Sequence, residues 1–535
     1  MKTMINSIIL ASCLALPLAS CSDSDAAPEQ KDWSTTTYFN SSDAAAQDTY
    51  YKPAVGYVGD PMPFFDPVAG DFKVLYLQDF RPNPEGTYHP IWGVSTKDAA
   101  HYTALGELVS CGTLKSQDAA IGTGSTIYDE ASKLYYTFYT GNKYKPTGDE
   151  SAQAVMVATS ADFKTWTKDR TFLIKGQDFG YDKNDFRDPF VFKGDDGKFH
   201  MLVSTKKGGK GSLAEFVSDD LKNWTDNGVF MTMMWDRFYE CPDLFKMGDY
   251  WYLVYSELHH AVRRVQYFKG RTLDELKACT ANDAGIWPDA HEGFLDSRGL
   301  YAGKTASDGT NRYLWGWCPT RSGKDNTAVG ASPAEPEWAG NLVCYKLIQH
   351  EDGTLTLGQI DAVSEKYNQD VAVEVKESQN MTEAEGTYTL VGNAEQPDAY
   401  MLMGRLGSHN KISFTVTTSN KWDKFGISMV RGSDSKKYYT MVVNPEDENN
   451  RKVNFEEQGV EGKGFIAGID GYVFARPADN VYNVTIYTDN SICVMYINDV
   501  CSYTNRIYGI QKNCWSINSY NGANVKISNL KISQY

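Results

Sequence analysis

A short turn motif recurs in the first part of the chain and limits the folds that the chain can adopt. Segment 160–166 (SADFKTW) matches 218–224 (SDDLKNW) position by position, 96–102 is a looser copy, and 271–276 is a degenerate fourth. The first three copies lie about 60 residues apart, somewhat more than the roughly 40–50 residues of common propeller repeats. Between the copies the chain reads as short β runs with almost no helical periodicity. The sequence therefore predicts an all-β chain that begins with a β-propeller built from four-stranded blades.

A second repeated feature places acidic residues just before apolar strands. Asp60, Asp188 and Glu240 are each followed within two residues by a proline and then by an apolar run. The segment 122–127 (GTGSTI) occupies the intermediate place in the repeat without an acid. Because the innermost strand of every blade runs along the central channel, residues at the same point of successive inner strands converge on the axis. The register predicts that the three acids meet in one funnel.

Three carboxyl groups around one pocket favour glycosidase chemistry. Burial and mutual repulsion raise the pKa of at least one such group, and glycosidases use one ionised and one protonated carboxyl group at the scissile bond. Arg187 is expected to keep its neighbour Asp188 ionised. Glu240 is followed by Cys241 and a proline, neither of which compensates a negative charge, so Glu240 is the expected proton donor. Asp185 has no role in this prediction.

The pattern of apolar and polar residues along the sequence divides the chain into two globular parts. Residues 49–358 carry the β runs and the repeats and are predicted to form the propeller, which is the catalytic domain. The polar and charged stretch 359–380 is predicted to be a linker. In 381–535 apolar and polar residues alternate at period two, which is typical of half-buried antiparallel strands and predicts a β-sandwich. A chain of 535 residues is long enough for both domains.

The first residues have the pattern of an export signal. Lys2 precedes an apolar stretch, 8–18, and small residues lead to Cys21. The sequence LASC resembles a bacterial lipoprotein signal, in which the cysteine is lipidated; a plain secretory signal is the alternative. Residues 1–20 are predicted to be the signal, and the small, polar and acidic stretch 21–48 a flexible tether. The protein is expected to be exported and lipid-anchored to a bacterial membrane, the outer one.

Charge and cysteine usage exclude several other classes. The net charge is −16 and no block rich in lysine and arginine stands out, so nucleic acid and anionic membrane surfaces are poor partners. Two of the ten cysteines lie in the signal, and the other eight form no C-x-x-C pair and no zinc-finger spacing. Most of the eight stand in apolar runs, where cysteine behaves as a small hydrophobic residue. They are predicted to be buried free thiols, and no metal site is predicted.

Several motifs in fixed order resemble those of glycoside hydrolase family 32, which holds the invertases, inulinases and levanases. They are GDP at 59–61, FRDP at 186–189, ECPD at 240–243, LDSRGLYAGKT at 295–305 and YLWGWC at 313–318. The resemblance runs through most of residues 50–357 and continues into 491–509, which is similar to the C-terminal sandwich of that family. It implies a five-bladed β-propeller followed by a β-sandwich. It also implies retaining hydrolysis of β-fructofuranosides, with a carbohydrate as partner and no cofactor.

The resemblance also assigns roles to single residues. Asp60 is the implied nucleophile, Asp188 the transition-state stabiliser and Glu240 the acid/base. A retaining mechanism needs the nucleophile and the acid/base carboxyl groups roughly 5–5.5 Å apart. The residues implied to contact the sugar are Gln78, Trp92, Thr123, Arg187 and Trp317.

This chain departs from the family pattern at three places. Gly59 stands where the usual N-D-P-N-G has its asparagine, and 122–125 (GTGS) lacks the aromatic residue of the usual F-S-G-S. Gly299 stands near the place of a usual aspartate, for which Asp296 is the candidate substitute. The catalytic acids are kept while subsite contacts differ, so the substrate is expected to diverge more than the reaction.

Two other functions fit the same residues. Related five-bladed propellers cleave arabinofuranosides or xylosides, usually with inversion, and the altered pocket suits another furanoside or pentoside. A surface glycan-binding protein without activity is the alternative of another class. The presence of all three acids argues against that second alternative.

Overall fold

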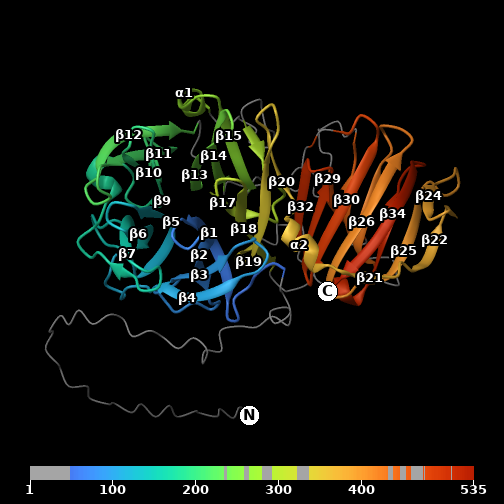
Figure 1. Cartoon of the computed structure of the whole chain (residues 1–535), viewed down its shortest axis with the longest axis horizontal. Coiled ribbons are helices and arrows are strands. Elements are labelled where there is room, and N and C mark those ends of the chain that lie inside the picture. The colour runs from blue at the N-terminus through green and yellow to red at the C-terminus, as the bar shows by residue number, and fades with distance from the viewer. Residues whose placement is uncertain are drawn as a thin grey trace, which may run out of the picture.

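The computed structural model has two all-β domains side by side, a propeller and a sandwich (Figure 1). The residues that it describes are 49–233, 238–257, 264–279, 292–321, 336–431, 438–445, 453–458, 474, 476–507 and 509–535. Cys21, the predicted signal and the predicted tether lie outside these residues. No helix among the described residues is long and apolar enough to cross a membrane.

The propeller consists of five antiparallel units in chain order. The first holds β1 (Tyr57–Asp66), β2 (Asp71–Asp79), β3 (Ile91–Thr96) and β4 (Thr103–Val109). The second holds β5 (Ala120–Asp129), β6 (Leu134–Asn142), β7 (Gln153–Ser160) and β8 (Thr167–Lys168). The third, after a 3-10 turn (Gly176–Phe179), holds β9 (Phe186–Lys193), β10 (Phe199–Lys207), β11 (Lys210–Ser218) and β12 (Thr225–Thr232). The fourth holds β13 (Glu240–Met247), β14 (Tyr250–Glu257), β15 (Arg264–Gly270), α1 (Leu273–Lys277) and β16 (Glu292–Phe294). The fifth holds β17 (Tyr301–Ser307), β18 (Arg312–Arg321), β19 (Pro336–Gln349) and β20 (Leu355–Gly358).

The first strand of each unit belongs to a closed inner ring. Strand β1 contacts β5, β5 contacts β9, β9 contacts β13, β13 contacts β17, and β17 contacts β1 again. The last unit is joined to the first by the pairing of Val58 in β1 with Gly340 in β19. This bridge puts β17–β19 and β1–β4 into one continuous sheet. The five-bladed propeller predicted from the sequence is confirmed.

The recurring turn motif has the same structure in three blades. Each copy follows the third strand of its blade, and an aspartate side chain in each accepts hydrogen bonds from the backbone N–H groups of the second and third residues after it. The residue after that aspartate has a positive φ in every copy: Ala99 (58°), Phe163 (61°) and Leu221 (63°). The fourth copy has the expected place after β15, but there Thr272 caps the short helix α1 by accepting from the Glu275 N–H. The repeat is thus a real structural period, with one altered member.

Every inner strand carries an irregularity at an equivalent place. The register shifts between Gly59 and Met62 in β1, opposite Leu202 and Ser204 in β9, and between Glu240 and Asp243 in β13. The two other shifts fall between 122 and 124 in β5 and between 301 and 304 in β17. Such bulges re-aim side chains and are frequent next to active sites. Pro189 lies within β9 at the bulge, where no ladder donor is needed.

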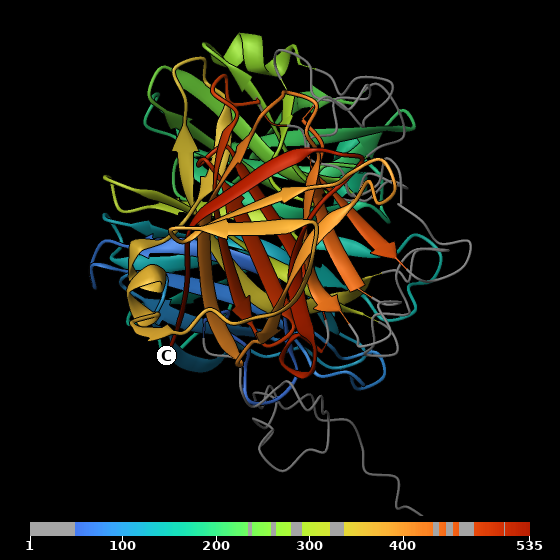
Figure 2. The same ribbon diagram turned by 90° about the vertical axis from the view of Figure 1, so that its right-hand side faces the viewer.

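The C-terminal domain is a sandwich of two antiparallel sheets, seen from its own side in Figure 2. One sheet runs β23 (Met381–Ala384), β24 (Thr387–Val391), β34 (Asn524–Gln534), β26 (His409–Thr418), β30 (Val481–Asp489), β31 (Ile492–Ile497) and β32 (Cys501–Arg506). The other runs β22 (Val375–Gln379), β25 (Ala399–Arg405), β33 (Cys514–Ser519), β27 (Phe425–Arg431), β28 (Tyr438–Val443) and β29 (Val453–Gln458). A short 3-10 turn, Ile510–Lys512, precedes β33. Alternating apolar residues of both sheets fill one shared core.

The segment 359–380, predicted as a linker, is ordered and belongs to the second domain. It forms the helix α2 (Asp361–Lys366), the strand β21 (Gln369–Val371), which pairs with β34, and the strand β22, which pairs with β25. These short strands lie at sheet edges with mostly exposed side chains, so their sequence carries no apolar alternation. The eight cysteines from Cys111 to Cys514 form no disulfide among the described residues, and six of them are buried.

Candidate active site

The bulges of the inner ring bring together side chains from all five blades. Asp60 comes from β1, Thr123 from β5, Asp188 from β9, Glu240 from β13 and Tyr301 from β17. The carboxyl groups are close enough for their charges to interact, because the charge of Glu240 raises the pKa of both Asp60 and Asp188. The convergence predicted from the register is therefore present in the structure.

Asp60 is held by one hydrogen bond to each carboxyl oxygen. The Thr123 hydroxyl donates to Oδ2 at 2.5 Å and the Trp317 indole N–H donates to Oδ1 at 3.0 Å. Desolvation raises the pKa of Asp60, while these two donors lower it and the charge of Glu240 raises it further. Both donors are themselves buried, which fixes the orientation of the carboxyl group. Trp317 and Thr123 thus contact the Asp60 carboxyl group directly.

Asp188 sits in a strained backbone conformation beside the same ring. Its φ is 59°, a region that non-glycine residues rarely adopt, and its N–H donates to the Thr140 hydroxyl at 2.8 Å. Its Oδ2 accepts the backbone N–H of Cys241 at 2.9 Å. Burial raises the pKa of Asp188 to about 6, against the lowering effect of Arg187 and with a further raise from Glu240. The carboxyl group therefore titrates close to neutral pH.

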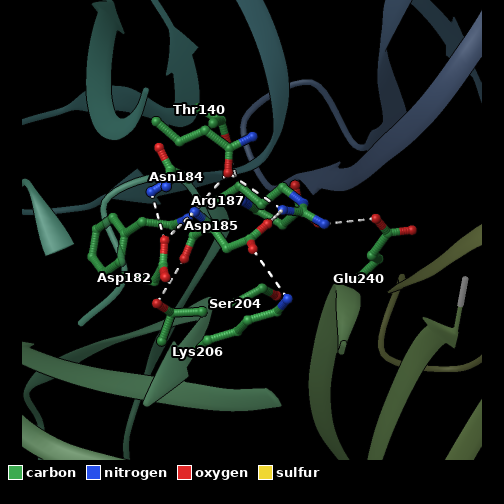
Figure 3. Close-up of polar contacts among 12 residues, drawn as sticks. Thr140, Asp182, Asn184, Asp185, Arg187, Ser204, Lys206 and Glu240 are labelled. Carbon is green, nitrogen blue, oxygen red and sulfur yellow. Dashed lines mark hydrogen bonds and ion pairs between the residues drawn. The ribbon is translucent and has the colours of Figure 1, made fainter. Parts of the chain in front are cut away.

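Arg187 connects two other carboxylates. Its Nη1 donates to Asp185 Oδ1 at 2.7 Å and its Nη2 to Glu240 Oε1 at 2.9 Å, as Figure 3 shows. Asp185 also pairs with Lys206 at 3.3 Å. The guanidinium group lies over the ring of Phe238, 3.9 Å from its centroid. Asp185, which had no predicted role, thus anchors the arginine that reaches the acid/base candidate.

The prediction that no positive charge compensates Glu240 is wrong, because Arg187 donates to it. Arg187 was expected to keep Asp188 ionised while Glu240 stayed uncompensated, but its guanidinium group donates to Glu240 and Asp185, and also to Gln153 at 3.3 Å. Neighbours in an extended strand point to opposite sides, so adjacency in the sequence does not make the two side chains partners. The charge of Arg187 still lowers the pKa of Asp188, but desolvation raises that pKa by more.

Tyr301 and Lys304 belong to the same site and were not predicted. The Tyr301 hydroxyl donates to Glu240 Oε2, and Tyr301 has in the fifth blade the register place that Glu240 has in the fourth. Lys304 is buried and donates to the carbonyl of Gly124 at 2.8 Å. Its charge interacts with Asp188 and Asp60. Both residues stand at the register shift of β17, and both lie in the motif LDSRGLYAGKT at 295–305, which is the signal that could have pointed to them.

Gln78 and Trp92 lie on the second and third strands of the first blade. Gln78 is fully buried and donates to the carbonyl of Val55 at 2.6 Å. Its Oε1 and the indole N–H of Trp92 have no hydrogen-bond partner among the described residues. Their predicted contact with the sugar stays a prediction.

Asp296 does not lie with the three acids. It is completely buried, and its carboxylate accepts hydrogen bonds from Ser297, Ser502 and Thr504. Two of these donors belong to β32 of the sandwich, so Asp296 ties the domains together and is not free to hold a sugar. Nearby, a Cβ on Gly299 would lie 2.0 Å from the carbonyl oxygen of Thr504. The sandwich backbone thus occupies the space that an aspartate at 299 would need.

The fold and the site together define a class of protein. A five-bladed propeller presents at its axis a partly buried aspartate, Asp60, a buried aspartate, Asp188, and a glutamate, Glu240, that is bonded to an arginine and a tyrosine. Paired carboxyl groups with different environments are the equipment of a glycoside hydrolase. Among the described residues no group of histidine, cysteine and acidic side chains could hold a metal ion.

Comparison with known families identifies the relationship. Residues 50–360 match "Glycosyl hydrolases family 32 N-terminal domain" and residues 353–532 match "GH32, BT1760-like, C-terminal domain". The chain therefore belongs to glycoside hydrolase family 32, as its motifs indicate, and is a divergent member of it.

Curated relatives are distant and only partly covered. An insoluble beta-fructofuranosidase isoenzyme of Arabidopsis thaliana is 26% identical over 320 residues, which is 54% of this chain and 51% of that enzyme. A sucrose-6-phosphate hydrolase of Staphylococcus xylosus is 24% identical over 345 residues, 61% of this chain and 65% of that enzyme. The matched stretches thus span between half and two thirds of these relatives.

Solved structures share the whole architecture. The sucrose-6-phosphate hydrolase of Lactobacillus gasseri superposes with a TM-score of 0.67 at 18% identity, covering 92% of this chain and 93% of that one. Fructan 1-exohydrolase IIa of Cichorium intybus gives a TM-score of 0.66 at 16% identity, covering 92% and 97%. At such low identity the likeness shows the fold, a propeller followed by a sandwich.

Proposed function

We propose that this protein is a retaining glycoside hydrolase that cleaves β-fructofuranosides, with fructan oligosaccharides or polysaccharides as substrates. One observation carries the proposal: the Asp60 carboxyl group is fixed by two buried donors beside Glu240. A carboxyl group held in one orientation suits a nucleophile, because attack needs a defined angle and distance. Membership of the family and the names of its relatives support the substrate class.

The proposed reaction has two steps. Asp60 attacks the anomeric carbon, the glycosidic C–O bond breaks, and Glu240 gives its proton to the departing oxygen. Water then attacks the glycosyl–enzyme ester, Glu240 takes back a proton, and Asp60 is released. Asp188 is proposed to bind sugar hydroxyls and to stabilise the oxocarbenium-like transition state. Arg187, which donates to Glu240, is proposed to donate to the same hydroxyls.

The test combines product analysis with two substitutions. The purified protein is incubated with sucrose, inulin, levan and arabinan, and the first-formed anomer is followed by NMR. Retained configuration on a fructan or sucrose is expected. Inversion would reject the mechanism, and cleavage of arabinan alone would favour another furanosidase. Asp60→Ala and Glu240→Ala are expected to abolish turnover with the fold intact, and full activity in either would overturn the assignment of roles.

We also propose that the protein is exported and lipid-anchored through Cys21 to the outer membrane of a bacterium. The support is the sequence alone: an apolar stretch, small residues and a cysteine, followed by a polar tether. Labelling with a fatty-acid analogue in the native host tests this proposal. Wild type is expected to take up label and to pellet with membranes, whereas Cys21→Ala is expected to do neither. Equal labelling of both would show that Cys21 is not the site.

A further inference from the structure

The residue before the nucleophile candidate has no side chain, and an aromatic ring occupies the space. A Cβ built on Gly59 would lie 2.2 Å from Cη2 of Trp338 and within 2.9 Å of two more atoms of that ring. Real Cβ atoms do not approach other atoms so closely, so Trp338 and any side chain at residue 59 exclude one another. The ring therefore lies directly against the backbone beside Asp60.

Trp338 is held in this place by its own backbone and by the residue before it. Arg81 donates through Nη2 to the Trp338 carbonyl and through Nη1 to Glu337 at 2.8 Å. Thr320 donates to the same glutamate at 2.6 Å, and Asp79 pairs with the guanidinium group at 2.9 Å. This network fixes the start of β19, so the ring is positioned before any ligand arrives.

The surroundings of the ring are aromatic. The imidazole of His89 stacks on it with centroids 4.1 Å apart and planes inclined by 17°. The ring of Trp317, which donates to Asp60, has its centroid 6.1 Å from that of Trp338. Trp338 also packs against the cluster that contains Cys241 and Tyr301, so it adjoins the acids. Trp338 is partly exposed.

We propose that Trp338 determines sugar specificity beside the nucleophile, by presenting an apolar surface where residue 59 offers no polar side chain. This inference rests on the proposed function, because it takes Asp60 as the attacking group. A C–H edge of a furanose ring packs favourably on an indole, whereas a hydroxyl in the same place would lose its water partners without replacement. The site therefore selects furanosides that turn a C–H edge toward Gly59, and it rejects those that need a hydrogen bond there.

Steady-state kinetics of three variants test the proposal on the best substrate among sucrose, inulin and levan. Trp338→Ala is expected to raise KM about tenfold, the loss of one aromatic contact, while kcat changes less than about threefold. Trp338→Phe keeps a ring and is expected to stay within about threefold of wild type. Trp422→Ala, at an exposed tryptophan of the sandwich (64% exposed), is the matched control and is expected to change nothing.

A double variant tests specificity itself. Trp338→Ala combined with Gly59→Asn places an amide in the vacated space, and the ratio of kcat/KM between the three substrates is expected to shift about tenfold or more. An unchanged ratio, together with an unchanged KM in Trp338→Ala, would overturn the inference and leave the proposed function standing. A fall in kcat with constant KM would also overturn it, because Trp338 would then act only through Trp317 and Asp60. If the wild type cleaves none of the sugars, the proposed function fails. The role of Trp338 is then tested by calorimetric binding of the same sugars. Equal Kd values for wild type and Trp338→Ala would reject a role of the ring in binding.

Discussion

The carboxylate of Asp296 in the propeller accepts both the N–H and the hydroxyl of Thr504 in the sandwich, each at 2.7 Å. In return Arg506 of the sandwich donates to the carbonyls of Cys318 and Pro319, both at 3.0 Å. These residues directly follow Trp317, which binds the nucleophile candidate. The second domain is therefore linked to strand β18, whose Trp317 holds the Asp60 carboxyl group.

This relationship predicts that Asp296 contributes to stability and not to substrate binding. Asp296→Asn would turn an amide N–H₂ toward groups that already donate, which leaves buried donors unsatisfied. The free energy of unfolding is expected to fall by about 2–4 kcal/mol, measured by urea unfolding, while KM of the folded enzyme stays within about threefold. Asp219→Asn at an exposed position is the control. A raised KM with unchanged stability would instead restore Asp296 as a sugar ligand.

Thr123 is predicted to keep the nucleophile ionised. Its hydrogen bond lowers the pKa of Asp60, so Thr123→Val is expected to raise that pKa and to move the acid limb of kcat/KM to higher pH. The loss of one hydrogen bond to a charged group corresponds to about a tenfold to hundredfold decrease below that limb. Thr126→Val, in the same strand but bonded to Thr137, is the control. A parallel decrease at all pH values would show that Thr123 acts on something other than protonation.

Asp188 is predicted to cost stability at neutral pH. Its pKa in the folded protein is about 6, above the ordinary value of about 3.9 for the unfolded chain. Between these values the folded state holds a proton that the unfolded state has released, so this group makes stability fall as the pH rises from about 4 to 6. Asp188→Asn cannot ionise and still accepts from Cys241, so it is expected to be more stable at pH 7 by on the order of 2 kcal/mol.

The same variant is expected to lose catalysis. Turnover of Asp188→Asn should fall at least about a hundredfold, because the charge that stabilises the transition state is gone. Urea unfolding between pH 4 and 8, with kcat on the same samples, gives both readouts. Identical stability curves for variant and wild type would contradict the raised pKa of Asp188.

Arg187 is predicted to be irreplaceable by lysine. Its planar guanidinium group donates hydrogen bonds to Asp185 and Glu240 at the same time. The single ammonium group of a lysine cannot reach both carboxylates with the same geometry. Arg187→Lys is expected to lower kcat/KM about a hundredfold with little change in thermal stability. Arg405→Lys, at an exposed site of the sandwich, serves as the matched control. Activity within twofold of wild type would show that the bidentate arrangement is dispensable.

The sequence predicted the elements that depend on local pattern. The turn motif around Asp98, Asp162 and Asp220 is built from side-chain to backbone hydrogen bonds within a few residues. Its repetition is therefore visible in the sequence and predicts the propeller. The ordered stretch 359–380 was missed because edge strands bury little and need no alternation.

What the sequence by itself determined about this protein is the repeat, the two-domain all-β architecture and the register that gathers Asp60, Asp188 and Glu240. Only the tertiary structure decided which partner each charge has. Arg187 donates to Glu240 and not to its neighbour Asp188. Asp296 accepts hydrogen bonds from the sandwich residues Ser502 and Thr504. The physical reason is distance along the chain: these contacts form only when the ring of blades closes and the second domain docks. Backbone bulges and the packing of remote strands then set where each side chain points, and no local pattern encodes that.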